Sequence, residues 1–106
     1  MFVCECNLNR SPTFERYFKE HYPQFEVKSC GTLYGYPERL TDSILAWADI
    51  VFAMERKQEN VIRYRFPQHY KKVVVVGVPD VYDPDQKELL DFIKEWSEQY
   101  FKNKGD

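Results

Sequence analysis

The organisation of this chain follows from its opening stretch, Met1-Phe2-Val3-Cys4-Glu5-Cys6-Asn7-Leu8-Asn9-Arg10-Ser11-Pro12. The pattern predicts a short strand, a tight polar loop and the first turn of a helix. Phe2 and Val3 are the apolar end of the strand. Ser11 suits an N-cap position, and Pro12 suits the first helical position, where its missing N–H costs nothing.

The loop opens with a cysteine and closes with an arginine. Its backbone N–H groups and the positive end of the following helix favour a bound anion. Arg10 adds a planar guanidinium that can hold two oxygens of one phosphate, and Asn7 can brace the loop through its own backbone. Together these groups favour the Cys4 thiolate, which would be a nucleophile directed at phosphorus. The alternative is a small buried Cys4 and a surface Arg10.

The rest of the chain alternates strand and helix patterns. Apolar residues at helical spacing predict helices over 12–21, 41–48 and 56–66, and a last one from Asp83-Pro84 to about residue 102, with Thr41 and Glu55 as N-caps. Apolar runs predict strands at 1–4, 25–31, 50–54 and 73–76. This order favours an α/β fold with right-handed crossovers on a four-stranded parallel sheet.

Ligands bind such sheets at the carboxyl ends of the strands. Cys4 follows the first predicted strand and Asp80 follows the fourth, so we expect both at one edge. Hydrolysis of a phosphate monoester also requires an acid that protonates the leaving oxygen. Asp80 and Asp83 are the two candidates, and Asp83 has an alternative role as a helix cap.

Composition indicates one globular domain over residues 1–106, with 43% apolar and 17% aromatic residues. A net charge of −2 gives no general case for nucleic acid or membrane binding. Three cysteines without a secretory pattern favour free thiols in a reducing cytoplasm. No cofactor is expected. A metal-binding site is a weak alternative, because the spacing of its candidate ligands in the sequence is unusual for zinc. The candidate ligands are Cys4, Cys6, Cys30, His21 and His69.

The opening motif Phe-Val-Cys-x-x-Asn-x-x-Arg-Ser-Pro resembles the phosphate-binding loop of the low-molecular-weight protein tyrosine phosphatases and the related arsenate reductases. Further similar segments are 27–32, 40–41, 47–55 and 78–82, so the resemblance covers most of residues 1–93. It implies a three-layer αβα fold and a cysteine-dependent phosphatase that hydrolyses phosphotyrosine or similar aryl phosphates through a phosphocysteine intermediate, without a metal.

The resemblance also implies roles for individual residues. Cys4 is the nucleophile, Arg10 stabilises the phosphoryl oxygens and Asp80 is the general acid. Ser11 is the hydroxyl that hydrogen-bonds the thiolate. The remaining expected substrate-binding residues are Glu5, Cys6, Asn7, Leu8 and Asn9 of the loop, with Tyr34 and Tyr82 at the mouth of the site.

Several positions depart from the family pattern. Cys6 replaces the usual loop glycine, Asn9 replaces a protective cysteine, and Val81 replaces the proline after the acid. Cys6 could substitute in a disulfide with Cys4, although a bridge at this spacing is strained. Glu5 places a carboxylate on the rim of an anion site. The wall loop after residue 32 is also shorter than in larger family members.

These departures keep two other functions open. One is a phosphate- or phosphoprotein-binding module with little turnover. The other is arsenate reduction with an external thiol, since the thioredoxin-linked kind needs late cysteines and none follows Cys30. The expected partner is a phosphotyrosine protein or a small aryl phosphate, bound by a monomer or a weak homodimer.

Overall fold

A computed structural model describes residues 1–5, 10–32, 39–79, 82–83 and 86–103 of the chain. Four strands are present: β1 (Phe2–Cys4), β2 (Ser29–Gly31), β3 (Val51–Ala53) and β4 (Val73–Val75). The helices are α1 (Arg10–His21), α2 (Asp42–Trp47), α3 (Arg56–Arg65) and α4 (Lys87–Asn103), with a 3₁₀ segment η1 (Pro67–Lys72) before β4. None of the helices described is long and apolar enough to cross a membrane.

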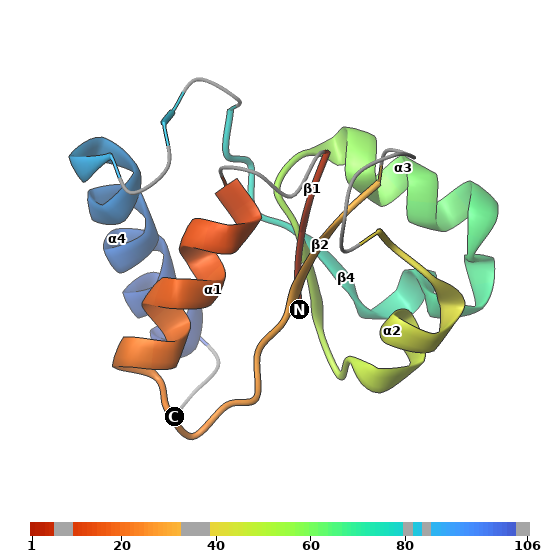
Figure 1. Cartoon of the computed structure of the whole chain (residues 1–106), viewed down its shortest axis with the longest axis horizontal. Helices are drawn as coiled ribbons and strands as arrows, with labels where there is room; N and C mark the ends of the chain where they lie inside the picture. The colour runs from red at the N-terminus through yellow and green to blue at the C-terminus, as the bar shows by residue number, and fades with distance from the viewer. Residues whose placement is uncertain (6–9, 33–38, 80–81, 84–85, 104–106) are drawn as a thin grey trace.

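The four strands form one sheet in the order β2-β1-β3-β4, and all three pairings are parallel. Cys4 lies opposite Gly31 on β2, and Val3 lies between Cys30 and Ala53. This result confirms the predicted four-stranded parallel sheet. The carboxyl ends of the strands therefore meet at one edge, which is the upper edge in Figure 1.

Helices cover both faces of the sheet, as the three-layer prediction required. In Figure 1, α1 and α4 lie on one side, and α2 and α3 lie on the other. Alternate residues of β1 serve the two sides, since Phe2 and Cys4 belong to the core under α1 and α4, whereas Val3 belongs to the core under α2 and α3. Burial on both faces explains why the central strands are continuous apolar runs.

The predicted start of α1 is wrong by two residues. The helix begins at Arg10, so Ser11 is its second residue and Pro12 its third. Proline fits here because the first four N–H groups of a helix have no partner inside the helix. The hydroxyl of Ser11 is consequently not a cap, and it points instead toward Cys4.

Two other boundaries also differ from prediction. The alternating pattern at Phe25 and Val27 predicts strand, but β2 begins only at Ser29, and Phe25 is exposed. The last helix begins at Lys87 rather than at Asp83-Pro84. The carbonyl of Asp83 accepts the N–H of Gln86 at 3.2 Å, and the N–H of Asp83 donates to Gln86 Oε1 at 2.9 Å.

The predicted caps of α2 and α3 are confirmed. Thr41 Oγ1 accepts the backbone N–H of Ile44 at 3.2 Å. Glu55 occupies the N-cap of α3, and its backbone N–H donates to Oε1 of Gln58 at 2.7 Å. Gln58 is itself buried, so the start of α3 is held firmly at the carboxyl edge of the sheet.

Candidate active site

Cys4 is the last residue of β1 and lies in the buried core at the carboxyl edge of the sheet. Its carbonyl accepts the backbone N–H of Thr32, which also donates to the carbonyl of Glu5. These bonds, at 3.1 and 2.8 Å, join the beginning of the predicted anion loop to the end of β2. The candidate nucleophile thus stands on a strand in the middle of the sheet rather than on a free loop.

The side chain of Ser11 lies beside this sulfur. Its Oγ lies 2.9 Å from the Cys4 Sγ and 3.5 Å from the carbonyl oxygen of Cys30. With a thiol, the sulfur can donate to Ser11 while Ser11 donates to Cys30. With a thiolate, the single hydroxyl proton of Ser11 can turn to the sulfur. The arrangement therefore serves both protonation states of Cys4.

Arg10 begins α1 and is 2% exposed, which is unusual for a guanidinium. Its Nη1 donates to Glu55 Oε1 at 2.7 Å and to the carbonyl of Val78 at 2.9 Å. The short contact with Glu55 is a charge-assisted ion pair. The alternative in which Arg10 is a surface charge is therefore wrong.

Glu5 follows Cys4 on the rim, and its carboxylate lies 3.6 Å from the Nζ of Lys57 on α3. Both side chains are partly exposed, so this pair is weaker than the one at Arg10. Lys57 supplies a positive charge that offsets the carboxylate at the entrance. The expected repulsion of anions by Glu5 is correspondingly reduced.

The segment after β4 reaches the same edge. Gly77 has a φ of 87°, a conformation that glycine adopts easily, and a Cβ added there would meet nothing within 4 Å. The turn carries the backbone to Val78, whose carbonyl contacts Arg10. Tyr82 is half-buried against the core under α1 and α4, and Asp83 is exposed.

The structure brings together four of the predicted site residues, namely Cys4, Glu5, Arg10 and Ser11, at the carboxyl edge. The candidate acid Asp80 and the expected mouth residue Tyr34 lie outside the described residues. So do the other loop positions that were expected to bind substrate, which are Cys6, Asn7, Leu8 and Asn9. The sequence predicts Glu55 only as a helix cap, and its contact with Arg10 was not expected. A carboxylate two residues after a buried strand was the signal for it.

The weak metal alternative receives no support from the described residues. Cys4 and Cys30 lie on opposite faces of the sheet, in the two separate cores. In the parts of the chain that the structure describes, no three acidic, histidine or cysteine side chains gather as a metal would require.

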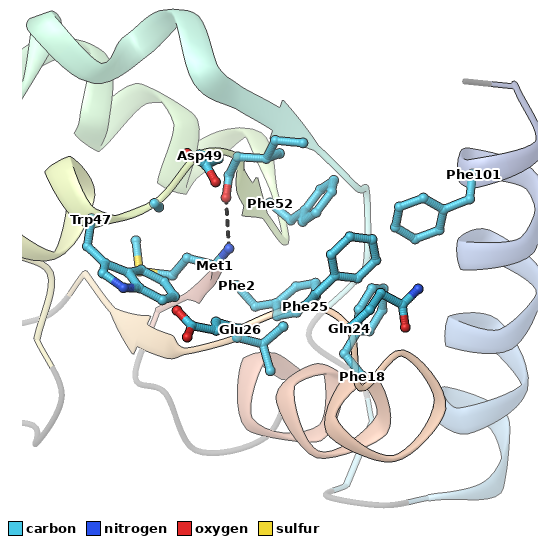
Figure 2. A pocket seen from close by; sticks show the side chains of 13 residues that line it. Met1, Phe2, Phe18, Gln24, Phe25, Glu26, Trp47, Asp49, Phe52 and Phe101 are labelled. Atoms are coloured by element: carbon cyan, nitrogen blue, oxygen red, sulfur yellow. Dashed lines mark hydrogen bonds between the residues drawn. The ribbon is translucent and has the colours of Figure 1, made fainter. Parts of the chain in front are cut away.

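A pocket of about 370 Å³ lies at the other end of the sheet, around the amino end of β1 (Figure 2). Three of its lining residues, Phe25, Trp47 and Ile50, are large apolar side chains that remain exposed. The Met1 α-amino group donates to the Ile50 carbonyl at 2.7 Å, and its burial lowers its pKa to about 6. The pocket contains none of the predicted site residues, so its size alone does not identify it as the active site.

A cysteine ends the first strand, an arginine begins the next helix, and the parallel sheet has the order β2-β1-β3-β4. Solved structures of phosphatases share this fold. The fold is that of the low-molecular-weight tyrosine phosphatases. Solved structures of such proteins superpose on nearly the whole chain.

One is the tyrosine phosphatase Wzb of Escherichia coli K30 with bound phosphate, at a TM-score of 0.80 and 18% identity, covering 98% of this chain and 96% of Wzb. Another is the arginine phosphatase YwlE, at 0.79 and 25% identity, covering 99% and 95%. A low-molecular-weight phosphotyrosine phosphatase of Vibrio cholerae matches at 0.76 and 21%, covering 99% and 97%. Neither a scan of family models nor a search of curated proteins finds a match.

Proposed function

We propose that the protein is a phosphatase that hydrolyses phosphate monoesters with Cys4 as nucleophile. The observation that carries the proposal is the arrangement of three residues at one edge of the sheet: the sulfur of Cys4, the hydroxyl of Ser11 2.9 Å away, and the buried guanidinium of Arg10 at the start of α1. The fold supports it, because tyrosine and arginine phosphatases share it.

The proposed reaction has two steps. The Cys4 thiolate attacks phosphorus, the bond from phosphorus to the ester oxygen breaks, and Asp80 gives its proton to the leaving alcohol. Asp80 then removes a proton from water, which attacks phosphorus and releases inorganic phosphate and the Cys4 thiolate. Arg10 and the loop amides stabilise the phosphoryl oxygens in both steps. Ser11 stabilises the departing thiolate. The reaction needs no redox partner.

A relative supports the phosphocysteine intermediate. In the YwlE structure, the active-site serine of a cysteine-to-serine variant carries a phosphoryl group. That serine replaces a cysteine, so the position of an active-site cysteine can carry a phosphoryl group in that protein. We place the corresponding intermediate on Cys4.

We propose phosphotyrosine, in a protein or as a small aryl phosphate, as the substrate, with the protein acting as a monomer or weak homodimer in the cytoplasm. Phosphoarginine is a second candidate, favoured by the likeness to YwlE at 25% identity. Parallel assays of a phosphotyrosine peptide and a phosphoarginine peptide of the same sequence distinguish the two.

The test is steady-state hydrolysis of para-nitrophenyl phosphate between about pH 4.5 and 8, the range in which carboxyl and thiol groups of such sites titrate. The variants are Cys4→Ser, Asp80→Asn and Asp83→Asn. We expect loss of activity in the first, a large reduction in the second and little change in the third, because Asp83 is exposed and its backbone is bonded to Gln86.

Three outcomes would change the assignment. A large loss in Asp83→Asn with little in Asp80→Asn would move the acid to Asp83. No turnover by the reduced wild type, with phosphate still bound, would favour the binding module. Reduction of arsenate in the presence of an external thiol, without phosphatase activity, would favour the reductase.

A further inference from the structure

Arg10 is the group that must face the phosphoryl oxygens, and its direction is set by contacts far along the chain. One nitrogen, Nη1, donates to both Glu55 and the carbonyl of Val78, at 2.7 and 2.9 Å. A guanidinium Nη carries two hydrogens, and these two acceptors account for both. Nη1 is therefore fixed to the protein scaffold, which orients the plane of the guanidinium.

Glu55 is well suited to hold another side chain in place. It lies between β3 and α3, two residues after the last residue of the strand, and its backbone N–H is bound by the buried Gln58. Its carboxylate is 27% exposed, whereas Arg10 is 2% exposed. The carboxylate thus compensates a nearly buried charge, a contact that is costly to remove because the other charge would then be unpaired.

A second ion pair at the start of α3 can be compared with the pair between Glu55 and Arg10. Lys57, two residues after Glu55, pairs with Glu5 across 3.6 Å, and the side chains are 66% and 36% exposed. The start of α3 therefore contacts both ends of the predicted anion loop. The longer, exposed pair is screened by solvent, whereas the pair at Arg10 is short and shielded. We therefore attribute the role of α3 in placing Arg10 to Glu55 rather than to Lys57.

We propose that Glu55 is a positioning residue, which holds the Arg10 guanidinium in the orientation that binds the phosphoryl group. The inference rests on the proposed function only through the identity of the anion. The inference also predicts the direction in which the affinity for the anion changes when the Glu55 carboxylate is removed. A carboxylate near an anion site repels the anion, so its removal should tighten binding if Glu55 merely offsets charge. If Glu55 orients Arg10, removal of the acceptor should weaken binding.

The experiment compares Glu55→Met, Glu55→Ala and Glu55→Gln. Methionine keeps most of the length without an acceptor, alanine removes the side chain, and glutamine keeps an oxygen acceptor without the charge. Glu59→Gln is the matched control, because Glu59 lies one turn later on α3 and pairs with the exposed Arg56 at 3.7 Å. Circular dichroism identifies the folded variants, and the Kd for inorganic phosphate is measured by calorimetry, with KM and kcat for para-nitrophenyl phosphate.

Loss of a hydrogen-bonded partner of a charged group corresponds to about a 10- to 100-fold change. We therefore expect Glu55→Met and Glu55→Ala to raise the Kd for phosphate and to lower kcat/KM by this factor. Glu55→Gln should restore both to within about three-fold of the wild type, as expected where the acceptor matters more than the charge. The control should bind phosphate like the wild type.

Tighter phosphate binding by Glu55→Gln, or unchanged binding by a folded Glu55→Met or Glu55→Ala, overturns the inference. Because glutamine is close in shape to glutamate, that variant keeps the test decisive if the others do not fold. Wild-type protein that binds phosphate without turnover, with weaker binding in Glu55→Met, would reject the phosphatase and retain the positioning role. Turnover that is unchanged by the Glu55 substitutions would retain the phosphatase and reject the positioning role.

Discussion

The hydroxyl oxygen of Ser11 lies 2.9 Å from the sulfur of Cys4, across the junction between β1 and α1. The serine is completely buried, so water cannot easily replace it as a donor. Both residues are fixed by regular secondary structure, one at the end of a strand and the other in the first turn of a helix. A hydrogen-bond donor is therefore permanently held beside the candidate nucleophile.

We expect Ser11→Ala to lower kcat for an aryl phosphate by about 10- to 100-fold, since hydrogen bonds to charged groups contribute about 1.5–3 kcal/mol. KM should change less, because the serine acts on the sulfur rather than on the substrate. Steady-state kinetics measure both constants. Ser97→Ala is the control, because Ser97 is equally buried but bonds to Tyr22 and to the Lys94 carbonyl. Equal losses in the two variants would contradict a specific role for Ser11.

The pair between Glu5 and Lys57 leads to a prediction about substrate charge. We expect Lys57→Gln to change the free energy of unfolding by less than about 0.5 kcal/mol, because the pair is exposed. The unpaired Glu5 should raise KM for a phosphopeptide with acidic neighbours by about two- to five-fold at low salt, and less at about 1 M salt, where charges are screened within about 3 Å.

A peptide with basic neighbours serves as the comparison substrate, and Lys94→Gln, an exposed lysine on α4, as the control variant. The same rise in KM for acidic and basic peptides would show that Lys57 acts on something other than rim charge.

The Met1 amine predicts a pH dependence of stability. Its pKa is about 6 in the folded chain against 8.0 for an ordinary terminal amine, mainly because of burial. The unfolded chain therefore binds more protons between these values, so stability should rise from pH 6 to pH 8. Two pKa units correspond to about 2.7 kcal/mol.

Urea unfolding at both pH values, on the free and the Nα-acetylated chain, isolates this contribution from other titrating groups. Between pH 6 and pH 8 the rise should be larger for the free amine by roughly 2 kcal/mol, because part of the full difference lies outside this interval. The same pH dependence in both chains would disprove the assignment to Met1.

Lys72 provides a prediction about the fold itself. Its ammonium group donates to the carbonyls of Leu45 and Ala48 at the end of α2, the latter at 2.8 Å. We expect Lys72→Met to lower the free energy of unfolding by about 1–3 kcal/mol, because these part-buried carbonyls would lose a charged donor. Denaturant unfolding measures the effect. The neighbouring Lys71→Met, at an exposed lysine, should differ little from the wild type.

The sequence was most informative where the signal is local. The valine run of β4, the cap at Thr41 and the alternation of strands and helices follow from neighbouring residues, and the structure confirms each of them. The start of α1 was missed because proline is tolerated throughout the first helical turn, so its position does not fix the first residue. The start of β2 was missed because alternation at Phe25 and Val27 does not require a strand.

The site residues also differ in whether a local sequence pattern identifies them. The cysteine and arginine form a pattern within seven residues, and the role of Ser11 beside the sulfur followed from the resemblance. The partner of Arg10 lies 45 residues further along the chain, between β3 and α3, and no pattern within the loop motif points to it, so Glu55 was recognised only as a helix cap. Which side chain compensates a buried charge is decided by tertiary packing.

The two acceptors of Arg10 Nη1 are 45 and 68 residues further along the chain. Such contacts have a high entropic cost of loop closure, so they form only when β3 and the segment after β4 have joined the sheet. Anion affinity is therefore a reporter of complete folding. Conversely, phosphate at 100 times its Kd should stabilise the native state by about 2.7 kcal/mol, so the product of the proposed reaction would favour the folded protein.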